Sequence, residues 1–420
     1  MECSWKAVLL LVLASLAIQY TAIRTLSSKP ATMCRVAKHT VCAPTVAASC
    51  QPSSHILILA TTRSGSSFIG QLLNQHPDIF YLFEPLYHVQ TTLINSSLRS
   101  RPPSAPSSPA TRRLLLGAYR DLLRSLFHCR LSELETFIKP TPQQHRTQRL
   151  FRRGASKALC SPPVCSPLLP GAGGSLGGRG VGERWEEGQC VRRCGALNLT
   201  LASRVCSRRL HIAIKTVRIP ELRDLRPLLE DPRLNLKVVQ LVRDPRGILS
   251  SRMDTFPDSF RSWNMWRNSG RRPRNLDPSH LTATCQDFLN SVSTGLARPS
   301  WLKGRYMLLR YEDLAREPER KAQEMYRFLG LDMDPSVLRW IINNTRGPGT
   351  SAKHKFGTVR DSAATAQSWR LKLSFHMVQL VQNLCNITLS QLGYRMVNSP
   401  QELTNLSLNL AQHTNLLPFL

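Results

Sequence analysis

Two segments of the sequence combine residue types that bind oxyanions. The first is a turn rich in Ser and Gly that contains one Arg, and the second places a Ser eight residues after an Arg. Backbone N–H groups at a helix start, hydroxyl donors and a guanidinium fork are groups with which proteins hold phosphate and sulfate. A Ser-rich helix cap would look similar. The predicted anion-binding residues of the first segment are Thr62, Arg63, Ser64, Gly65, Ser66, Ser67 and Phe68.

The second segment is suited to grip another phosphate at a distance from the first turn. Arg243 ends an apolar run, and Ser251 lies about two turns into the helix that we expect after it. Arg252 adds positive charge nearby, as does Arg246. The alternative is an ordinary basic loop in which Asp244 caps the helix. The predicted binding residues here are Arg243, Asp244, Pro245, Arg246, Gly247, Ile248, Leu249, Ser250 and Ser251.

Both segments follow short apolar runs of the kind that form parallel strands buried on both faces. Strands that alternate with helices predict an α/β fold, here a single P-loop-like domain with a mainly parallel central sheet flanked by helices. The last predicted helix carries Met377, Leu380, Val381, Leu384 and Ile387 on one face. We expect strands at 55–60, 79–83, 211–217, 236–242 and 306–310, and helices at 67–75, 319–329 and 373–392.

Changes in composition predict how the chain is organised. An apolar run near the start is short for a membrane span, which needs about 20 residues, and a cleaved signal peptide is the alternative to an uncleaved anchor. Two Pro-rich segments are predicted to lie on the surface: a mobile loop at 99–113 and a Cys-, Pro- and Gly-rich insertion at 160–206. The expected parts are a cytoplasmic tail (1–6), a transmembrane signal anchor (7–23), a stem (24–54), the catalytic domain (55–394) and a C-terminal tail (395–420).

Glycosylation sequons and cysteines both agree with a lumenal location. All but one of the 12 cysteines follow the predicted anchor, enough for several disulfides in an oxidising compartment. Five of them lie close together, at positions 160, 165, 190, 194 and 206, and their pairing stays open. A zinc site is the alternative, since Cys190 and Cys194 are spaced like metal ligands. The N-x-Ser/Thr sequons are at Asn95, Asn198, Asn343, Asn386 and Asn405.

The charge balance indicates anionic partners. The chain has 56 Lys and Arg residues against 27 Asp and Glu residues, a formal net charge of +29. Such an excess attracts nucleic acid, anionic lipid, acidic small molecules or acidic glycans, although a merely solvated basic surface is the alternative. The apolar fraction of 42% is enough for a sizeable core and excludes wholesale disorder.

Taken together, the two anion-binding segments resemble the 5′-phosphosulfate and 3′-phosphate loops of sulfotransferases that use 3′-phosphoadenosine 5′-phosphosulfate (PAPS). The sequence is most similar to the Golgi carbohydrate 6-O-sulfotransferases that modify galactose, GlcNAc and GalNAc. Within that family it most resembles the enzymes that act on galactose in keratan sulfate. The matching stretches are 3–11, 57–90, the Tyr-Glu-Asp-Leu at 311–314, 356–360 and 362–370.

This resemblance implies the ligands of each segment. Residues 62–68 would bind the 5′-phosphosulfate, Arg243 and Ser251 would hold the 3′-phosphate, and 358–370 would close over the nucleotide. It further implies PAPS as the sulfuryl donor, no metal, an acidic glycan acceptor and no nucleic-acid partner. We expect a single-pass type II protein of the Golgi membrane with its catalytic domain in the lumen, and a homodimer stays open.

Sulfuryl transfer should resemble phosphoryl transfer, with in-line attack and negative charge growing on the leaving oxygen. Arg63 is the residue that we predict to stabilise this charge electrostatically. Glu84 is the predicted base for the attacking hydroxyl, because the glycan sulfotransferases that this chain resembles use a carboxylate. The alternative for Glu84 is a cap or a pair with an Arg. His76 and His88 are weaker candidates, and Lys215 is a candidate for the wall of the acceptor site.

Two other classes of function stay open at this point. A lumenal kinase or phosphotransferase would need the G-x-x-x-x-G-K-[ST] pattern, which the first segment lacks. A non-catalytic module that binds heparin-like glycan explains the charge, but not two anion loops after two buried strands. For an enzyme, the predicted acceptor is C6 of galactose in keratan sulfate or related lactosamine chains. C6 of GlcNAc or GalNAc is the alternative acceptor.

Overall fold

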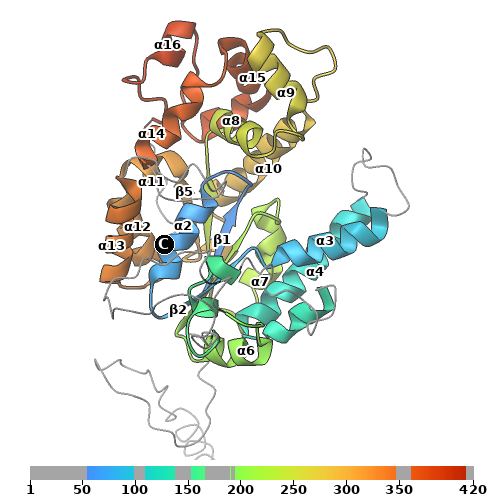
Figure 1. Ribbon diagram of the computed structural model, residues 1–420, viewed down its shortest axis with the longest axis vertical. Coiled ribbons are helices and arrows are strands. Elements are labelled where there is room, and N and C mark those ends of the chain that lie inside the picture. Colours follow the sequence, from blue (N-terminus) through green and yellow to red (C-terminus); the bar gives the residue numbers. More distant parts are fainter. Residues whose placement is uncertain are drawn as a thin grey trace, which may run out of the picture. The chain divides into compact units, whose positions relative to one another are not determined.

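A sheet of five parallel strands, in the order β2-β3-β1-β4-β5, runs through the centre of the structure (Figure 1). The computed structural model describes residues 54–98, 109–137, 153–165, 190, 194–346 and 361–412. All five strands were predicted, and their ends differ from the prediction by at most one residue. The strands are β1 (Ser54–Ala60), β2 (Ile79–Phe83), β3 (His211–Thr216), β4 (Leu236–Val242) and β5 (Tyr306–Arg310).

Two hydrophobic cores lie on opposite faces of this sheet. Every residue of β1 is buried, and its side chains alternate between the two cores. Leu57 and Leu59 belong to the larger core, whereas Ile56 and Ile58 belong to the smaller one. A strand that must be apolar on both faces shows no polar alternation, which explains its continuous apolar run.

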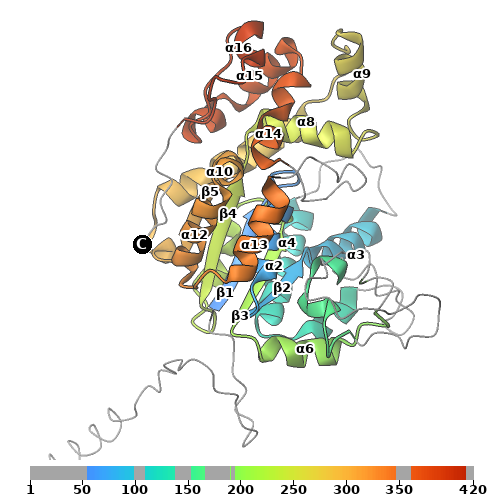
Figure 2. The ribbon, with the colours of Figure 1, turned by 60° about the vertical axis from the view of Figure 1, so that its left-hand side comes forward.

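Helices cover both faces (Figures 1 and 2). The smaller core is covered by α2 (Ser66–Gln75), α11 (Tyr311–Arg316), α12 (Pro318–Leu329) and α13 (Pro335–Thr345). The larger core takes in α3 (Leu86–Leu98), α4 (Pro109–Phe127), α6 (Leu199–Ser207), α7 (Arg226–Leu229), α8 (Pro245–Thr255), α9 (Arg261–Ser269), α10 (Ser279–Leu296) and α15 (Phe375–Gln391). The remaining helices are α14 (Ser362–Gln367), α16 (Pro400–Thr404) and the 3-10 turns Leu131–Phe137, Ala158–Cys160, Leu222–Leu225, Ser300–Leu302 and Ser368–Leu371.

Two local predictions were wrong. The loop expected at 99–113 includes the start of α4, because Pro109 sits at the first helical position, where its fixed φ is favourable. In α15, Ile387 does not share the buried face of Met377 and Val381; it is 61% exposed. The buried positions of α15 keep a spacing of three or four residues from Met377 through Cys385 to Leu389, and this spacing leaves Ile387 on the opposite side of the helix.

The folded part continues beyond residue 394, where a tail was expected. The Arg395 N–H donates to the Leu410 carbonyl oxygen at 2.8 Å, and the short helix α16 lies between these two residues. Leu403 and Leu410 are both buried in the larger core. The segment up to residue 412 is therefore part of the same packed structure.

Four disulfides join the described cysteines. Four members of the predicted cysteine cluster pair with one another, and the fifth pairs with a cysteine two residues after the end of α4. A sulfur in a disulfide is not a thiolate ligand, so this pairing replaces the zinc alternative. The pairs are Cys129–Cys206, Cys160–Cys190, Cys165–Cys194 and Cys285–Cys385.

None of the helices in the described ranges is both long enough and apolar enough to cross a bilayer. The predicted anchor at 7–23 and nearly all of the stem lie outside those ranges. The sequon asparagines whose side chains are described are all exposed, as glycosylation requires. They are Asn198, Asn343, Asn386 and Asn405.

Candidate active site

The carboxyl ends of the five parallel strands meet at one edge of the sheet. In open α/β sheets, this edge is where ligands bind. The loop after β1 carries the first predicted anion segment, and the loop after β4 carries the second. Glu84 follows β2 directly, and Lys215 lies near the end of β3. The parallel topology therefore brings the two anion segments, Glu84 and Lys215 to the same edge of the sheet.

The first anion segment is a tight turn that leads into α2. Arg63 and Gly65 both have left-handed backbone angles, with φ of 73° and 95°. A Cβ atom on Gly65 would lie 2.3 Å from the Tyr311 ring, so only glycine fits there. Ser64 is buried and donates to the Thr61 carbonyl oxygen at 2.8 Å, which shapes the turn.

Two serines are the first residues of α2, at the N-terminal end of the helix, which favours anions. The hydroxyl groups of Ser66 and Ser67 have no hydrogen-bond partner among the described residues, while Phe68 donates its N–H to the Gly65 carbonyl oxygen at 2.9 Å. The backbone N–H groups of the first helical turn carry partial positive charge. The serine hydroxyls and this helix end together form a donor set for an anion.

The two anion segments contact each other directly. Arg63 donates through Nε to Ser251 Oγ at 2.9 Å, and Arg243 donates through Nη1 to the Arg63 carbonyl oxygen at 3.0 Å. The Arg243 guanidinium also lies 4.5 Å from the centre of the Tyr311 ring. Its Nε is buried and has no hydrogen-bond partner among the described residues. An unsatisfied buried guanidinium nitrogen beside a phosphate-type loop indicates that a ligand completes the site.

The other predicted residues of the second segment build its frame. Arg246 is fully buried, and its donors go to Asp244, to Gln382 Oε1 at 2.8 Å and to the Arg395 carbonyl oxygen at 3.0 Å. Asp244 caps α8 by accepting from the Arg246 N–H. Pro245, Gly247, Ile248, Leu249 and Ser250 are buried in the same helix.

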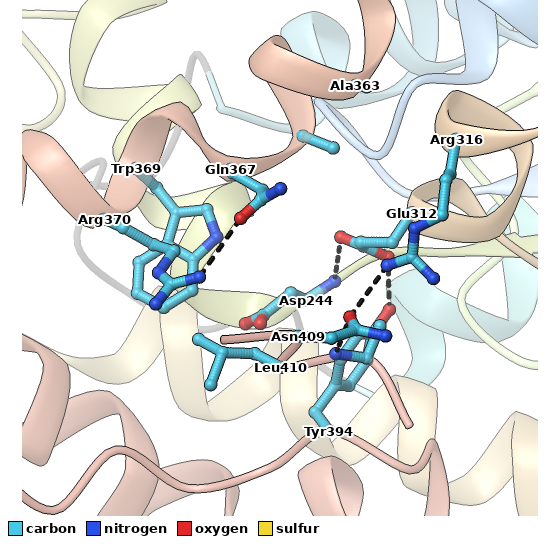
Figure 3. Close-up of a pocket in the computed structure, with 12 residues that line it drawn as sticks. Asp244, Glu312, Arg316, Ala363, Gln367, Trp369, Arg370, Tyr394, Asn409 and Leu410 are labelled. Atoms are coloured by element: carbon cyan, nitrogen blue, oxygen red, sulfur yellow. Dashed lines mark hydrogen bonds between the residues drawn. The ribbon is translucent and has the colours of Figure 1, made fainter. Parts of the chain in front are cut away.

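A small pocket lies beside the second segment (Figure 3). Glu312 sits in its wall, accepts from the Asp244 N–H at 3.1 Å and accepts from the Tyr394 hydroxyl at 2.6 Å. Burial, followed by the nearby charge of Asp244, raises the pKa of Glu312. The pocket has a volume of only about 40 Å³, and the contact of Glu312 with the Asp244 N–H holds the turn after β4.

Arg252 is a site residue whose role the sequence did not reveal. It donates to the Thr62 carbonyl oxygen at 3.2 Å, to Thr61 Oγ1 at 3.2 Å and to Thr284 Oγ1 on α10 at 2.9 Å. Burial lowers its pKa to about 10. The sequence marked Arg252 only as extra charge, because no local pattern shows that its side chain crosses to the first turn. It ties that turn to α10.

Glu84 is held in an ion-paired pocket. Its Oε1 accepts from Lys215 Nζ at 2.6 Å, its Oε2 accepts from the Val217 N–H at 3.3 Å, and Arg218 Nε lies 3.8 Å from Oε2. The backbone φ of Glu84 is 50°. Left-handed backbone at a non-glycine residue costs about 1–3 kcal/mol and persists where the surroundings enforce it, often at functional sites. The residues predicted as catalytic, Arg63 and Glu84, both have it.

The remaining candidates take other positions. His76 accepts from the Asp78 N–H through Nδ1 at 3.2 Å, and its Nε2 lies 3.1 Å from the Asp332 carbonyl oxygen, so it bridges structural loops. His88 is buried on α3. Lys215 is buried beside the Phe83 ring, 4.3 Å from its centre. Of the predicted closing segment, residues 358–360 lie outside the described ranges.

Comparisons with known proteins show the family to which the chain belongs. The sulfotransferase domain family matches residues 53–393. Carbohydrate sulfotransferase 1 of Danio rerio is 58% identical over 437 residues, which cover 100% of each chain. Carbohydrate sulfotransferase 3 of Mus musculus is 42% identical over 360 residues, which cover 85% of this chain and 71% of that protein. The sulfotransferase domain of the Synechococcus PCC 7002 olefin synthase has a TM-score of 0.38 and 17% identity, with 80% and 94% of the chains covered.

Proposed function

Because the chain belongs to the sulfotransferase family, we propose that it transfers the sulfuryl group of PAPS to the C6 hydroxyl of galactose. The acceptors are keratan sulfate or related lactosamine chains. The observation that carries this function is the contact between the two anion segments, in which Arg63 donates to Ser251 and Arg243 donates to the Arg63 carbonyl oxygen. Two phosphate-type loops in contact fit a nucleotide with two separate phosphate groups.

The donor set suits the two ends of PAPS. Residues 62–68 offer a helix N-terminus, hydroxyl groups and the Arg63 guanidinium to the 5′-phosphosulfate. Arg243 and Ser251 offer a guanidinium and a hydroxyl to the 3′-phosphate, and the unsatisfied Nε of Arg243 fits this role. Gly247 leaves room for that guanidinium, because a Cβ there would lie 3.1 Å from the same Nε.

The reaction makes one S–O bond and breaks another. The galactose O6 attacks the sulfur of PAPS, and the bond between that sulfur and the 5′-phosphate oxygen breaks. The products are the sugar 6-sulfate and 3′-phosphoadenosine 5′-phosphate (PAP), whose phosphate takes up the negative charge. Arg63 and the serines at the start of α2 stabilise this charge as it grows.

Glu84 receives the proton of the attacking hydroxyl. Lys215 and the Val217 N–H hold its carboxylate from two directions, which fixes its orientation. A base held rigidly near the attacking oxygen contributes about 10²–10⁴-fold to such a reaction. The contacts of Glu84 with Lys215 and Val217 support this role. The alternative, an ion pair with an Arg, corresponds to the longer contact of 3.8 Å with Arg218.

The chain stretches that resemble the keratan sulfate enzymes favour galactose as the acceptor sugar, with C6 of GlcNAc or GalNAc as the alternative. We further place the protein in the Golgi membrane, anchored by residues 7–23 with the catalytic domain in the lumen. Four disulfides support an oxidising compartment, and four exposed sequon asparagines are compatible with glycosylation there.

A transfer assay with the full chain in detergent tests the proposal. Radiolabelled PAPS is offered with desulfated keratan, desulfated chondroitin and a lactosamine oligosaccharide, for wild type, Arg63→Ala and Glu84→Gln. Exposed residues supply the matched controls, Arg261→Ala and Glu133→Gln. We expect label on galactose C6 that the controls retain and the two site variants lose. A folded wild-type protein that labels no sugar would contradict the enzymatic function.

A further inference from the structure

A second cavity opens beside the first anion segment. It has a volume of about 210 Å³ and lies between α10 and the carboxyl ends of β1, β3 and β4. Its polar wall consists of Thr61, Arg218, Gln240 and Asp287, and apolar side chains such as Ile219 and Phe288 complete it. The volume is below the roughly 300–1,000 Å³ of pockets for drug-sized ligands, so the cavity suits one small group.

The cavity is lined by neighbours of both predicted catalytic groups. Arg218 lines it and also lies 3.8 Å from the Glu84 carboxylate. Thr61 lines it as well and is the residue immediately before the first anion segment. A group bound in the cavity would therefore lie next to both the base and the sulfuryl-binding turn.

Several polar groups around the cavity have no hydrogen-bond partner among the described residues. Among the described residues, Asp287 has no hydrogen bond or ion pair. Arg218 Nε is buried without a hydrogen-bond partner, and its charged partner, Glu84 Oε2, lies 3.8 Å away. Gln240 accepts from the Tyr306 hydroxyl through Oε1 at 2.7 Å, while its amide N–H groups have no partner among the described residues. Unpaired polar groups in a partly buried wall cost free energy unless a ligand or water pairs with them.

The chemistry of this wall favours a neutral ligand with several hydroxyl groups. The unpaired Asp287 carboxylate would repel a phosphate or sulfate but accepts hydrogen bonds from hydroxyl groups. Arg218 and Gln240 are donors for hydroxyl oxygens, and Phe288 offers an apolar surface to C–H groups. A sugar ring has hydroxyl groups that both donate and accept hydrogen bonds, and C–H groups that pack on apolar side chains. The wall of the cavity provides partners for all three.

We propose that this cavity binds the sugar ring that receives the sulfuryl group, and that Asp287 positions the ring by accepting hydrogen bonds from its hydroxyl groups. This inference rests on the proposed carbohydrate sulfotransferase function and adds the site and a positioning residue to it. Asp287 does not touch the reacting atoms in this account; it aligns the acceptor with Glu84 and the first turn.

The position of Asp287 is held by neighbours on α10. Thr284, one turn earlier, accepts from Arg252, which also binds the first anion turn. Cys285 forms a disulfide with Cys385 of α15. These two links fix α10 against the sheet, so the carboxylate of Asp287 faces the cavity in a constant position relative to the turn. A positioning residue requires such a fixed support.

The environment of the carboxyl agrees with a group that awaits a ligand. Burial is the main cause that raises the pKa of Asp287 to about 6. The charges that face it are Arg112 on α4, which lowers the pKa, and Glu221 and Asp224, which raise it. Arg112 also pairs with Glu221, at 3.2 Å. Glu221 therefore has Arg112 as an ion-pair partner, whereas the carboxyl group of Asp287 stays in the cavity wall although burial disfavours its charged form.

The test compares Asp287→Asn with Asp258→Asn, an identical change at an exposed Asp between α8 and α9. The full chain is assayed with a lactosamine oligosaccharide for the KM of the acceptor, the KM of PAPS, kcat and the Kd of PAP. We expect the acceptor KM of Asp287→Asn to rise at least tenfold. Its kcat should stay within threefold, and the PAPS KM and PAP Kd within twofold. The Asp258 variant should match wild type throughout.

Acceptors that lack single hydroxyl groups sharpen this test. One of these deoxy sugars lacks the hydroxyl group that donates a hydrogen bond to Asp287. This acceptor should have a higher KM than the intact sugar with wild type, but not with Asp287→Asn. An acceptor KM for Asp287→Asn within twofold of wild type, while wild type transfers sulfate, would overturn the subsite and leave the function intact. No transfer by wild type would instead overturn the function. If Asp287→Asn loses PAP binding, the same measurements are made on Asp287→Glu. A raised acceptor KM in that variant supports the subsite, and an acceptor KM within twofold of wild type overturns it.

Discussion

Two arginine-rich regions of this molecule differ in whether their guanidinium groups are satisfied. We call the first the arginine frame: Arg246, Arg310 and Arg370, which join the ends of β4 and β5 to the C-terminal segment. Each is buried, and all three donate to carboxylate, amide or carbonyl oxygens, Arg370 to four carbonyl groups between residues 402 and 408. The second region is the carboxyl edge of the sheet, where Arg243 Nε and Arg218 Nε have no hydrogen-bond partner among the described residues.

This difference separates structural charge from functional charge. A net charge of +29 indicates an affinity for anions but does not say which basic residues bind them. In the arginine frame every described guanidinium is used to hold the chain, so no capacity is left for a ligand. At the carboxyl edge, two guanidinium N–H donors have no hydrogen-bond partner among the described residues. The backbone there is also left-handed at Arg63 and Glu84. Unsatisfied donors, rather than positive charge alone, mark the site.

The largest effect is expected from Glu84→Gln at the carboxyl edge. The amide keeps the shape of the side chain but cannot take the proton from the acceptor hydroxyl, so kcat should fall about 10²–10⁴-fold. PAP affinity should stay within threefold of wild type. Rapid-quench measurement of the transfer step gives kcat, and calorimetry gives the PAP affinity. A kcat within fivefold of wild type would remove Glu84 as the base.

In the arginine frame the loss should appear in stability. Arg310→Met leaves Asp313 and the carbonyl oxygens of Leu392 and Gln412 without their partner. Breaking a buried ion pair typically costs about 3–5 kcal/mol. Chemical denaturation of the purified chain measures the free energy of unfolding. Arg316→Met, at an exposed position of helix α11, which follows Arg310, is the control and should change the free energy of unfolding by less than about 0.5 kcal/mol. Equal losses in both variants would contradict the distinction.

A pair of neighbouring substitutions compares the two regions directly. Arg243→Lys removes the fork that we assign to the 3′-phosphate, so the Kd of PAP should rise about 10–100-fold with little change in Tm. Arg246→Lys weakens contacts to Asp244 and Gln382, so Tm should fall by several degrees while the Kd of PAP changes less. Calorimetry and thermal melts give both quantities. The reverse pattern would show that the unsatisfied nitrogen does not mark the phosphate site.

The smallest effect concerns pH and Asp287. Its folded-state pKa of about 6 lies above the ordinary value of about 3.9. Stability that is present below about pH 4 is therefore lost as the pH rises through about 6. Asp287→Asn removes this loss, so its Tm should exceed that of wild type by a few degrees at pH 7.5 and match it at pH 4. Thermal melts across this range measure the difference. A lower Tm at pH 7.5 would indicate a structural role for Asp287.

The sequence predicted the five strands and the turns that lead from β1 and β4 into helices, because buried parallel strands and Ser- and Gly-rich turns are local patterns. Lys215 and Glu84 were each noticed, but only the strand order shows that they pair, through the neighbouring strands β2 and β3. Arg246 carried the same local signal as Arg243, and only tertiary packing shows that its donors are used internally. Asp287 lay in no motif, since an isolated Asp on a helix usually faces solvent.

Hydrogen–deuterium exchange with and without PAP tests the central claim most directly. The account predicts slower exchange at the amides of residues 62–68 and 243–251 when PAP is bound. Exchange in the C-terminal segment 394–412, to which the arginine frame donates, should stay unchanged. Arg243→Lys should lose this protection at the same PAP concentration, and Arg246→Lys should retain most of it. Protection centred on 394–412, or none at the two anion segments, would contradict the assignment of the carboxyl edge as the sulfuryl-transfer site.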